Sequence, residues 1–154
     1  MATSLKNLSM YDAQNVPSAA GMTFGIVVSD YNSDITFALL KGCVEALLLH
    51  GAEKEDVLLQ HVPGSFELPL GAQLLYESHE IDAVICIGCV ITGETKHDDY
   101  INMAVSQAIM QLGLEYNTPF VFGVLTPRTH KQALERAGGK HGNKGVEAAI
   151  TAIK

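Results

Sequence analysis

The sequence has few charged side chains, since Lys, Arg, Asp and Glu make up only 18% of its 154 residues, against about 25% in a typical soluble domain. Hydrophobic residues make up 47%. We expect a small domain this poor in charge to cover much of its surface in contacts between subunits. The formal net charge is −7, which argues against nucleic-acid binding because that function needs a basic face.

Long apolar runs are also absent. No run approaches the roughly 18 residues of a membrane-spanning helix, and the first residues do not have the pattern of a secretory signal peptide. We therefore expect a cytoplasmic protein that does not bind membranes. The length fits one domain. Residues 1–22 have weak periodicity and small polar side chains, so we expect an arm that frays or docks on a neighbour, followed by a single domain at 23–154.

Cysteine is scarce, and the three thiols lack the context of a redox or metal motif. Cys86 and Cys89 have CxxC spacing, but both fall in a stretch predicted to be a strand. Residues three apart in a strand point to opposite faces and lie about 10 Å apart, too far for a disulfide. We expect these thiols, and that of Cys43, to be buried as small apolar groups.

Common cofactor and catalytic motifs are missing as well. The dinucleotide fingerprint GxGxxG does not follow the first predicted strand, and the 138–145 segment lacks P-loop spacing and follows a predicted helix. No serine occupies a nucleophile elbow, and the third predicted strand ends at Gly88 and Cys89 rather than at the aspartate of a signalling receiver. His97, Asp98 and Asp99 cannot converge on one ion as consecutive residues at a helix start. The sequence thus predicts neither a metal nor a cofactor, which leaves proton transfer and substrate positioning.

Buried strands alternate with amphipathic helices along the chain. Nearly continuous apolar runs predict strands at 23–29, 56–62, 82–89 and 119–125. Helical spacing predicts helices at 34–50, 66–78, 98–115 and 127–137, and a last helix from about 146. Four strand–helix units in this order predict an α/β fold with a parallel four-stranded sheet and helices on both faces.

The predicted helix boundaries carry capping residues. Asn32 and Ser33 are expected to cap the helix that starts at 34, because their side chains accept bonds from free helical N–H groups. Thr126 and Pro127 are expected to be the cap and first residue of the fourth helix. The glycine-rich 138–145 segment predicts a break, in which Asn143 caps the last helix.

The helix predicted at 98–115 has two apolar stripes. One is expected to face the sheet and comprises Ile101, Val105, Ala108, Ile109 and Leu112. The other lies on the opposite side, where the helix of a monomer should be polar, and comprises Met103, Met110 and Leu114. We interpret the second stripe as a helix-to-helix contact between subunits; isolated exposed apolar residues would be the alternative.

The segment at 81–100 runs from a buried strand through a short turn into a helix, and it is the main candidate for a site. Unpaired N–H groups at such a helix start attract anions, and open α/β sheets bind ligands at the carboxyl ends of their strands. His97 at this turn can move a proton near neutral pH, although it could instead serve only to cap the helix. Farther along, a cluster of cations favours an anionic partner, either a substrate phosphate or a neighbouring subunit: Arg136, Lys140, His141 and Lys144.

Four stretches in fixed order and spacing carry a family resemblance: VPGSFELP, GCVITGETKHDDY, PFVFGVLT and QALERAGGKHGNKGVEAA. From about Phe24 to the C-terminus the sequence resembles the 6,7-dimethyl-8-ribityllumazine synthase family. The resemblance implies a flavodoxin-like, three-layer α/β/α sandwich. It also implies the penultimate step of riboflavin biosynthesis, in which 5-amino-6-(D-ribitylamino)uracil and 3,4-dihydroxy-2-butanone 4-phosphate give the lumazine, phosphate and water without a cofactor or metal.

The resemblance also implies roles for individual residues. The groups that would bind the ribitylaminouracil are Tyr31, Ser65, Phe66, Glu67, Cys89, Val90, Ile91 and, from a neighbouring subunit, Phe122. The groups that would bind the butanone phosphate are Glu94, Thr95 and, from a neighbour, Arg136, with Lys144 as a possible helper. His97 would transfer protons, tuned by Asp98 or Asp99.

Two positions depart from the family pattern. The family often has arginine where this chain has Asp30 and Thr92, which implies that Arg136 and the helix start carry more of the phosphate recognition. The departures leave a second function open, a flavin- or lumazine-binding or shell-scaffold protein of the same fold. The resemblance further implies a homo-oligomer, either a pentamer or an icosahedral shell of twelve pentamers. It also suggests an N-terminal arm that adds a strand to a neighbour's sheet, and riboflavin synthase as a possible partner. The short GGKHGNKG segment favours the shell.

Overall fold

A four-stranded, fully parallel sheet forms the middle layer of the protein. The computed structural model describes residue 7 and residues 9–154. The strand order is β2-β1-β3-β4, with the strands β1 Phe24–Ser29, β2 Val57–Val62, β3 Ala83–Cys89 and β4 Phe120–Leu125. All four predicted strands are confirmed, and each begins one residue later than expected.

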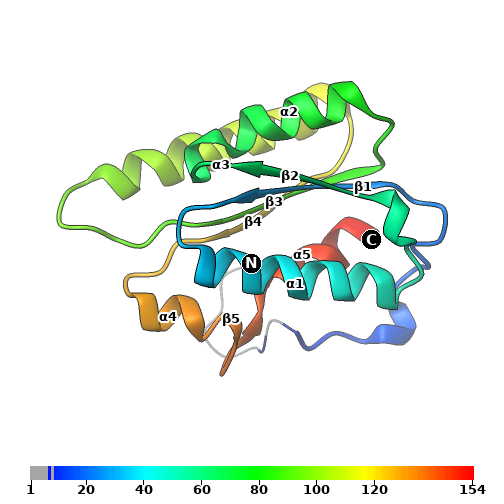
Figure 1. Ribbon diagram of the computed structural model, residues 1–154, viewed down its shortest axis with the longest axis horizontal. Coiled ribbons are helices and arrows are strands. Elements are labelled where there is room, and N and C mark those ends of the chain that lie inside the picture. Colours follow the sequence, from blue (N-terminus) through cyan, green and yellow to red (C-terminus); the bar gives the residue numbers. More distant parts are fainter. Residues whose placement is uncertain (1–6, 8) are drawn as a thin grey trace.

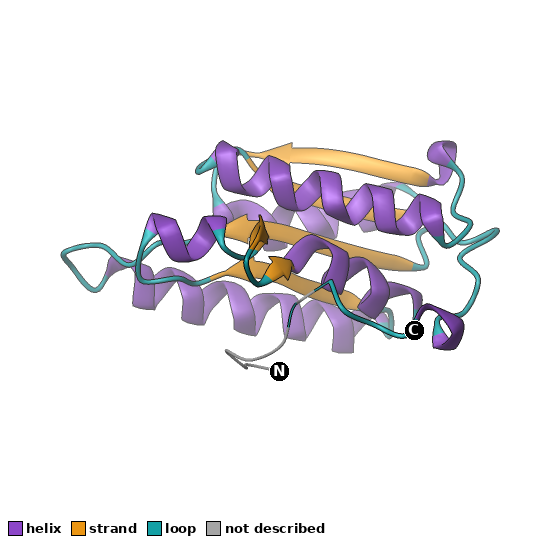
Figure 2. Ribbon diagram, turned by 90° about the horizontal axis from the view of Figure 1, so that it is seen from below, coloured by secondary structure: helices purple, strands orange, loops and turns teal. Residues whose placement is uncertain are grey.

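Helices cover both faces of this sheet. The main helices are α1 Ser33–Leu49, α2 Leu68–Ser78, α3 His97–Tyr116 and α5 Lys144–Ile153. Helices α2 and α3 lie on one face, and α1 and α5 lie on the other (Figures 1 and 2). The predicted three-layer α/β/α sandwich is therefore confirmed. Short elements complete the described chain: η1 Ala13–Asn15, η2 Lys54–Asp56, η3 Ser65–Glu67, α4 His130–Leu134, β5 Ala137–Gly139 and β6 Gly142–Asn143.

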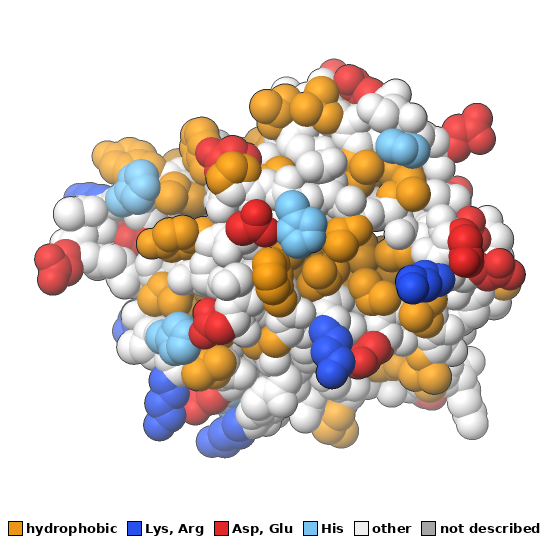
Figure 3. Space-filling view, in the orientation of Figure 1, with side chains coloured by type: hydrophobic (Ala, Val, Ile, Leu, Met, Phe, Trp, Pro, Cys, Tyr) orange, Lys and Arg blue, Asp and Glu red, His pale blue; other side chains and the backbone are white. Residues whose placement is uncertain are grey.

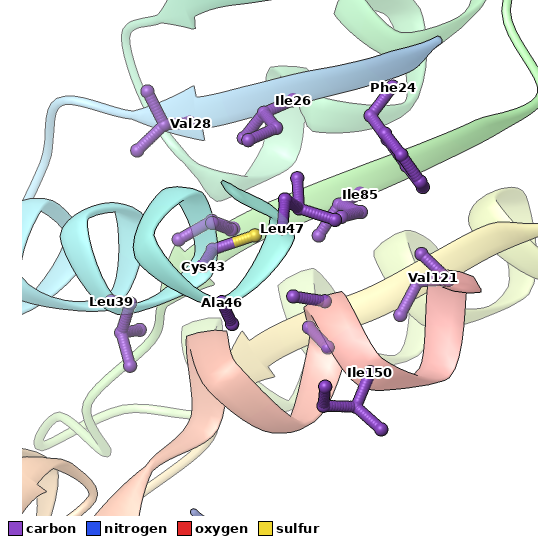
Figure 4. Close-up of a cluster of buried hydrophobic side chains, with 14 of the residues drawn as sticks. Phe24, Ile26, Val28, Leu39, Cys43, Ala46, Leu47, Ile85, Val121 and Ile150 are labelled. Atoms are coloured by element: carbon purple, nitrogen blue, oxygen red, sulfur yellow. The ribbon is translucent and has the colours of Figure 1, made fainter. Parts of the chain in front are cut away.

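Each face of the sheet has its own hydrophobic core. Alternate residues of β1, including Phe24, Ile26 and Val28, pack under α1 and α5 (Figure 4). Val27 belongs to the second cluster, with residues of α2 and α3. Every residue of β1 and β3 is buried, which explains the continuous apolar runs, because a parallel strand covered on both faces has no solvent side.

The cysteines lie where the strand geometry places them. Cys86 belongs to the core under α2 and α3, and Cys89 to the core under α1. All three thiols are free and buried, which confirms that Cys86 and Cys89 do not form a CxxC disulfide. Burial raises the pKa of the Cys43, Cys86 and Cys89 thiols to about 12.

The prediction for the fourth helix is wrong at its start. Thr126 and Pro127 do not begin α4; instead Thr129 caps it, with Oγ1 accepting the backbone N–H of Gln132 at 3.2 Å. The physical reason is a backbone ladder that extends past β4. The Val90 N–H donates to the Leu125 carbonyl at 2.8 Å, and the Thr92 N–H donates to the Pro127 carbonyl at 3.0 Å. The residues before 129 are therefore held beside the loop that follows β3, and α4 is shorter than expected.

The glycine-rich segment is more ordered than the predicted break, because it forms a two-stranded antiparallel hairpin, β5–β6. Asn143 caps α5 as expected, with Oδ1 accepting the N–H groups of Gly145 at 2.8 Å and Val146 at 3.4 Å. Its Nδ2 donates to the Ala38 carbonyl of α1 at 2.9 Å. A Cβ on Gly145 would lie 1.9 Å from the Leu39 carbonyl oxygen, so only glycine allows α1 and α5 to approach this closely.

The described part of the N-terminal arm lies on its own chain. Tyr11 Oη is 3.0 Å from His50 Nε2, and the Ala19 N–H donates to the His50 carbonyl at 2.9 Å. Ser9 Oγ accepts the Asn143 N–H at 2.8 Å. These contacts join the described part of the arm to the end of α1 and to the residue before α5; residues 1–6 and 8 of the predicted arm lie outside the described residues.

The two apolar stripes of α3 behave as the spacing predicts. Val105, Ile109 and Leu112 are buried against the sheet. The opposite stripe is exposed, with exposed fractions of 61% for Met103, 66% for Met110 and 77% for Leu114.

In the part of the chain that the structure describes, no helix combines the length and apolarity needed to cross a membrane.

Candidate active site

A cavity of about 740 Å³ opens at the carboxyl edge of the sheet. Three segments surround it: the β1–α1 turn, η3 and the long loop from β3 to α3, which projects beyond the sheet in Figure 1. The sequence predicts a ligand crevice at this edge, and its position follows from parallel topology, because the loops after all parallel strands meet there. The lining residues are Tyr31, Asn32, Gly64, Ser65, Phe66, Glu67, Cys89, Val90, Ile91, Thr92, Gly93, Thr95, His97, Asp98 and Ile101.

Most of the site residues named from the sequence meet in this cavity. They are Tyr31, Ser65, Phe66, Glu67, Cys89, Val90, Ile91, Thr95 and His97. The side chains of Tyr31 and Phe66 are 72% and 59% exposed. Two aromatic rings with free surface therefore line a cavity of the size of a small-molecule site, an arrangement suited to a planar ligand.

Asn32 holds the β1–α1 turn in a way that the sequence does not reveal. Its backbone is left-handed, with φ 59°, and its side chain does not cap α1, so the capping prediction is wrong. Instead, Nδ2 donates to the Cys89 carbonyl at 2.9 Å. Asparagine tolerates this conformation better than most residues. The turn that carries Tyr31 is thereby tied to the end of β3.

Ser65 lies under the cavity beside the end of β3. It is buried, and its Oγ has no hydrogen-bond partner among the described residues. A Cβ on Gly88 would lie 2.6 Å from this oxygen, so the glycine makes room for the hydroxyl. An unpaired buried hydroxyl costs about 1–3 kcal/mol, and a ligand or water molecule held here would supply a partner.

His97 is the first residue of α3, and its backbone N–H donates to Thr95 Oγ1 at 3.4 Å. Among the described residues its imidazole has no hydrogen-bond partner, so the expected coupling to Asp98 or Asp99 is not made through such a bond. Asp98 is 9% exposed and lines the cavity near it. The imidazole is exposed and free to meet a substrate atom.

The remaining predicted residues lie outside the cavity of their own chain. Phe122 is a half-buried residue of β4 that packs against the core under α2 and α3. Arg136 donates from an η nitrogen to the Gln132 carbonyl at 3.1 Å. Lys144 Nζ is 2.7 Å from Glu147 Oε1. Glu94 is exposed in the loop before α3 but does not line the cavity.

The cavity lining contains no lysine or arginine. Its ionisable side chains are His97, the carboxylates Glu67 and Asp98, and the groups of Cys89 and Tyr31. Thr92 does not replace the missing cation as a donor to an anion, because its N–H and its hydroxyl both donate to the Pro127 carbonyl, at 3.0 and 3.5 Å. An anionic substrate would therefore need a cation from outside this chain's cavity.

The sequence did not indicate Gly64 and Gly93 as lining residues, and it gave Asn32, Thr92, Asp98 and Ile101 other roles. Asn32, Gly64, Thr92 and Gly93 lie in the loops after β1, β2 and β3, and Asp98 and Ile101 lie in the first turns of α3. The signal that could have found them is their position after β1, β2 or β3, because open α/β sheets bind ligands at the carboxyl ends of their strands.

The fold and cavity define an α/β protein with a small-molecule site at the carboxyl edge of a parallel sheet. The family model for 6,7-dimethyl-8-ribityllumazine synthase matches residues 21–154. The chain belongs to this family, which confirms the resemblance of the four sequence stretches.

Curated relatives support the assignment over the whole chain. The 6,7-dimethyl-8-ribityllumazine synthase of Porphyromonas gingivalis is 52% identical over 154 residues, covering 100% of this chain and 96% of the relative. The protein of the same name from Cytophaga hutchinsonii is 53% identical with the same coverage. That of Flavobacterium johnsoniae is 48% identical, covering 100% of this chain and 81% of the relative.

Proposed function

We propose that this chain is the transferase that condenses 5-amino-6-(D-ribitylamino)uracil with 3,4-dihydroxy-2-butanone 4-phosphate. The products are 6,7-dimethyl-8-ribityllumazine, phosphate and water, in the penultimate step of riboflavin biosynthesis. Family membership along the whole chain carries this activity. The family implies two small-molecule substrates, and the cavity has room for small molecules.

The pyrimidine is proposed to bind between the aromatic rim and the end of β3. Phe66 and Tyr31 offer ring faces, and the backbone from Cys89 to Ile91 borders the cavity. Ser65 and Glu67 would bind the polar atoms of the pyrimidine and the ribityl chain. The unpaired Ser65 hydroxyl supports this assignment, because a bound ligand would satisfy it.

The phosphate is proposed to bind at the start of α3, beside Glu94 and Thr95. The N–H groups of a helix start favour an anion, but the cavity of one chain has no lysine or arginine. This lack supports a shared site, in which Arg136 and Phe122 come from an adjacent subunit. Lys144 is the weaker candidate because its ammonium is already paired with Glu147.

The reaction needs proton transfers at each step. The uracil's amine attacks the butanone carbonyl and water is lost to form an imine; phosphate then leaves and the second nitrogen closes the ring. His97 is proposed to move these protons, because it is the histidine that lines the cavity and histidine is a common general acid and base. Holding both substrates together supplies much of the rate.

An assembly of subunits is proposed from the exposed apolar surfaces. The α3 stripe is 61–77% exposed, and Leu70 and Leu74 of α2 are also exposed. Soluble monomers rarely leave contiguous patches of this kind uncovered. We propose that the subunits form a pentamer. Because the segment before α5 is short, we further propose that twelve pentamers form a shell. Riboflavin synthase is a candidate partner of this assembly. The N-terminal arm before the domain at 23–154 is proposed to add a strand to a neighbour. Sedimentation that shows only pentamers would contradict the shell.

The test of the function is phosphate release on mixing the purified protein with both substrates, with each substrate alone as the control. Release that depends on both, in step with fluorescent lumazine, is expected. The competing function, a flavin- or lumazine-binding or scaffold protein, predicts lumazine binding without phosphate release.

The His97→Ala variant separates proton transfer from positioning. We expect kcat to fall about 10²-fold, the low end of general acid–base catalysis, because proximity is retained. Arg136→Ala should instead raise KM for the butanone phosphate. Complete loss of turnover in His97→Ala would contradict the large share given to proximity.

A further inference from the structure

The turn that carries Tyr31 is held by a pair of side chains that do not line the cavity. His61 Nδ1 lies 2.7 Å from Asp30 Oδ1. Backbone hydrogen bonds join the same two segments: the Asp30 N–H donates to the Val62 carbonyl at 2.8 Å, and the Tyr31 N–H donates to the Pro63 carbonyl at 3.0 Å. Strand β2 therefore fixes the residue that precedes Tyr31 both through its backbone and through its side chain.

His61 is itself held in place from a second direction. Its ring meets the ring of Phe37 on α1 edge to face, with centroids 5.7 Å apart and an interplanar angle of 84°. The histidine thus joins β2, the β1–α1 turn and the first half of α1. On the face shown in Figure 3, some of the histidine side chains lie beside acidic ones.

Tyr31 needs such support because its own side chain has little. The residue is 72% exposed, so core packing does not hold its ring at the cavity rim. The direction of the ring depends on the backbone of the turn, which is anchored on the other side by the bond from Asn32 to the Cys89 carbonyl. His61 does not line the cavity, so any effect that it has on substrate must pass through the turn.

We propose that the Asp30–His61 pair is a positioning device that directs the Tyr31 ring over the cavity and thereby sets the affinity for the ribitylaminouracil. The inference rests on the proposed function, because it gives the stacking role to Tyr31. His61 is a positioning residue here and touches no reacting atom.

The structure offers a matched control. His130 Nε2 lies 2.6 Å from Asp34 Oδ2, and the exposed fractions of the two pairs are similar, 54% and 56% against 46% and 54%. This second pair joins α4 to the first turn of α1 rather than to the residue before Tyr31. Its loss should remove a similar side-chain hydrogen bond without turning the tyrosine ring.

The experiment compares three variants by steady-state kinetics with both substrates. His61→Leu should raise KM for the ribitylaminouracil about two- to five-fold, the size of effect expected for one exposed side-chain hydrogen bond, and leave kcat and KM for the butanone phosphate unchanged. His61→Asn should stay close to the parent, because its amide places a donor near the position of Nδ1. His130→Leu should leave the uracil KM unchanged. Equal effects of His61→Leu and His130→Leu would overturn the proposal.

A double-mutant cycle with Tyr31→Ala decides whether the pair acts through the tyrosine. In the Tyr31→Ala background, His61→Leu should have no further effect on uracil affinity; additive effects would overturn the proposal. The cycle is also read by fluorescence titration with 6,7-dimethyl-8-ribityllumazine. If the parent protein binds this lumazine but releases no phosphate, the proposed function fails, while the titration cycle still decides the positioning role.

Discussion

Asn32 offers the sharpest test of how the turn beside the cavity is built. Its side chain donates to the Cys89 carbonyl at 2.9 Å, and its backbone has φ 59°. Asn32→Ala removes the hydrogen bond, which should lower the stability by about 1 kcal/mol. It also puts alanine, whose side chain cannot form a local hydrogen bond, in the left-handed region, which should cost about 1 kcal/mol more. Asn32→Gly loses the same bond but adopts the backbone without strain.

The expected order of stability is therefore the parent, then Asn32→Gly, then Asn32→Ala, with Asn32→Ala about 2 kcal/mol below the parent. The order of the two variants is the informative part, because glycine is ordinarily the less stable of the two by about 0.5–1 kcal/mol. Urea unfolding at one fixed protein concentration measures it, since subunit association makes stability depend on concentration. An alanine variant as stable as the glycine variant, or more so, would refute the reasoning.

Three further predictions follow from other parts of the chain. Gly145→Ala should destabilise the protein by about 3 kcal/mol or more, because its Cβ would overlap the Leu39 carbonyl; in urea unfolding, Gly93→Ala is the control, since nothing lies within 4 Å of its Cβ. The three buried thiols, with pKa raised to about 12, should resist iodoacetamide at pH 8 until the protein unfolds, and alkylation at equal rates in the folded and unfolded protein would contradict this. A hydrogen bond from Tyr116, and a lesser one from Gln73, lowers the pKa of Glu77 below its ordinary 4.5. The stabilisation is therefore present above pH 4.5 and lost as the pH falls through the lowered value. Tyr116→Phe should lower Tm at pH 6 more than at pH 3; an equal loss of Tm at both pH values would contradict the prediction.

The sheet could be predicted from the sequence because its strands are covered on both faces and read as apolar runs. The start of α4 could not, because Thr126 and Pro127 form a good local helix start. What overrides that preference is pairing with residues far away in the sequence, the bond from Thr92 to the Pro127 carbonyl. The β5–β6 hairpin could not be predicted for a different reason: a glycine-rich segment has no hydrophobic periodicity that would indicate a strand.

The candidate site could be predicted in part. The strand-to-helix loops place Phe66 and His97 at one edge, and the cavity brings them together. The role of Asn32 was not visible, because its bond partner is 57 residues away, and the Asp30–His61 pair spans 31 residues. A single sequence also does not say which subunit supplies Arg136, since its position in the chain is compatible with either.

The central claim is that both substrates react in the cavity at the carboxyl edge of the sheet. The most direct measurement is a crystal structure of the protein with bound 6,7-dimethyl-8-ribityllumazine. We expect the ring system to lie beside Phe66 and the backbone of Cys89 to Ile91, with His97 within reach of the reacting carbons. A lumazine bound elsewhere, such as in the shallow groove of α3 lined by Met110 and Leu114, with the edge cavity empty, would contradict it.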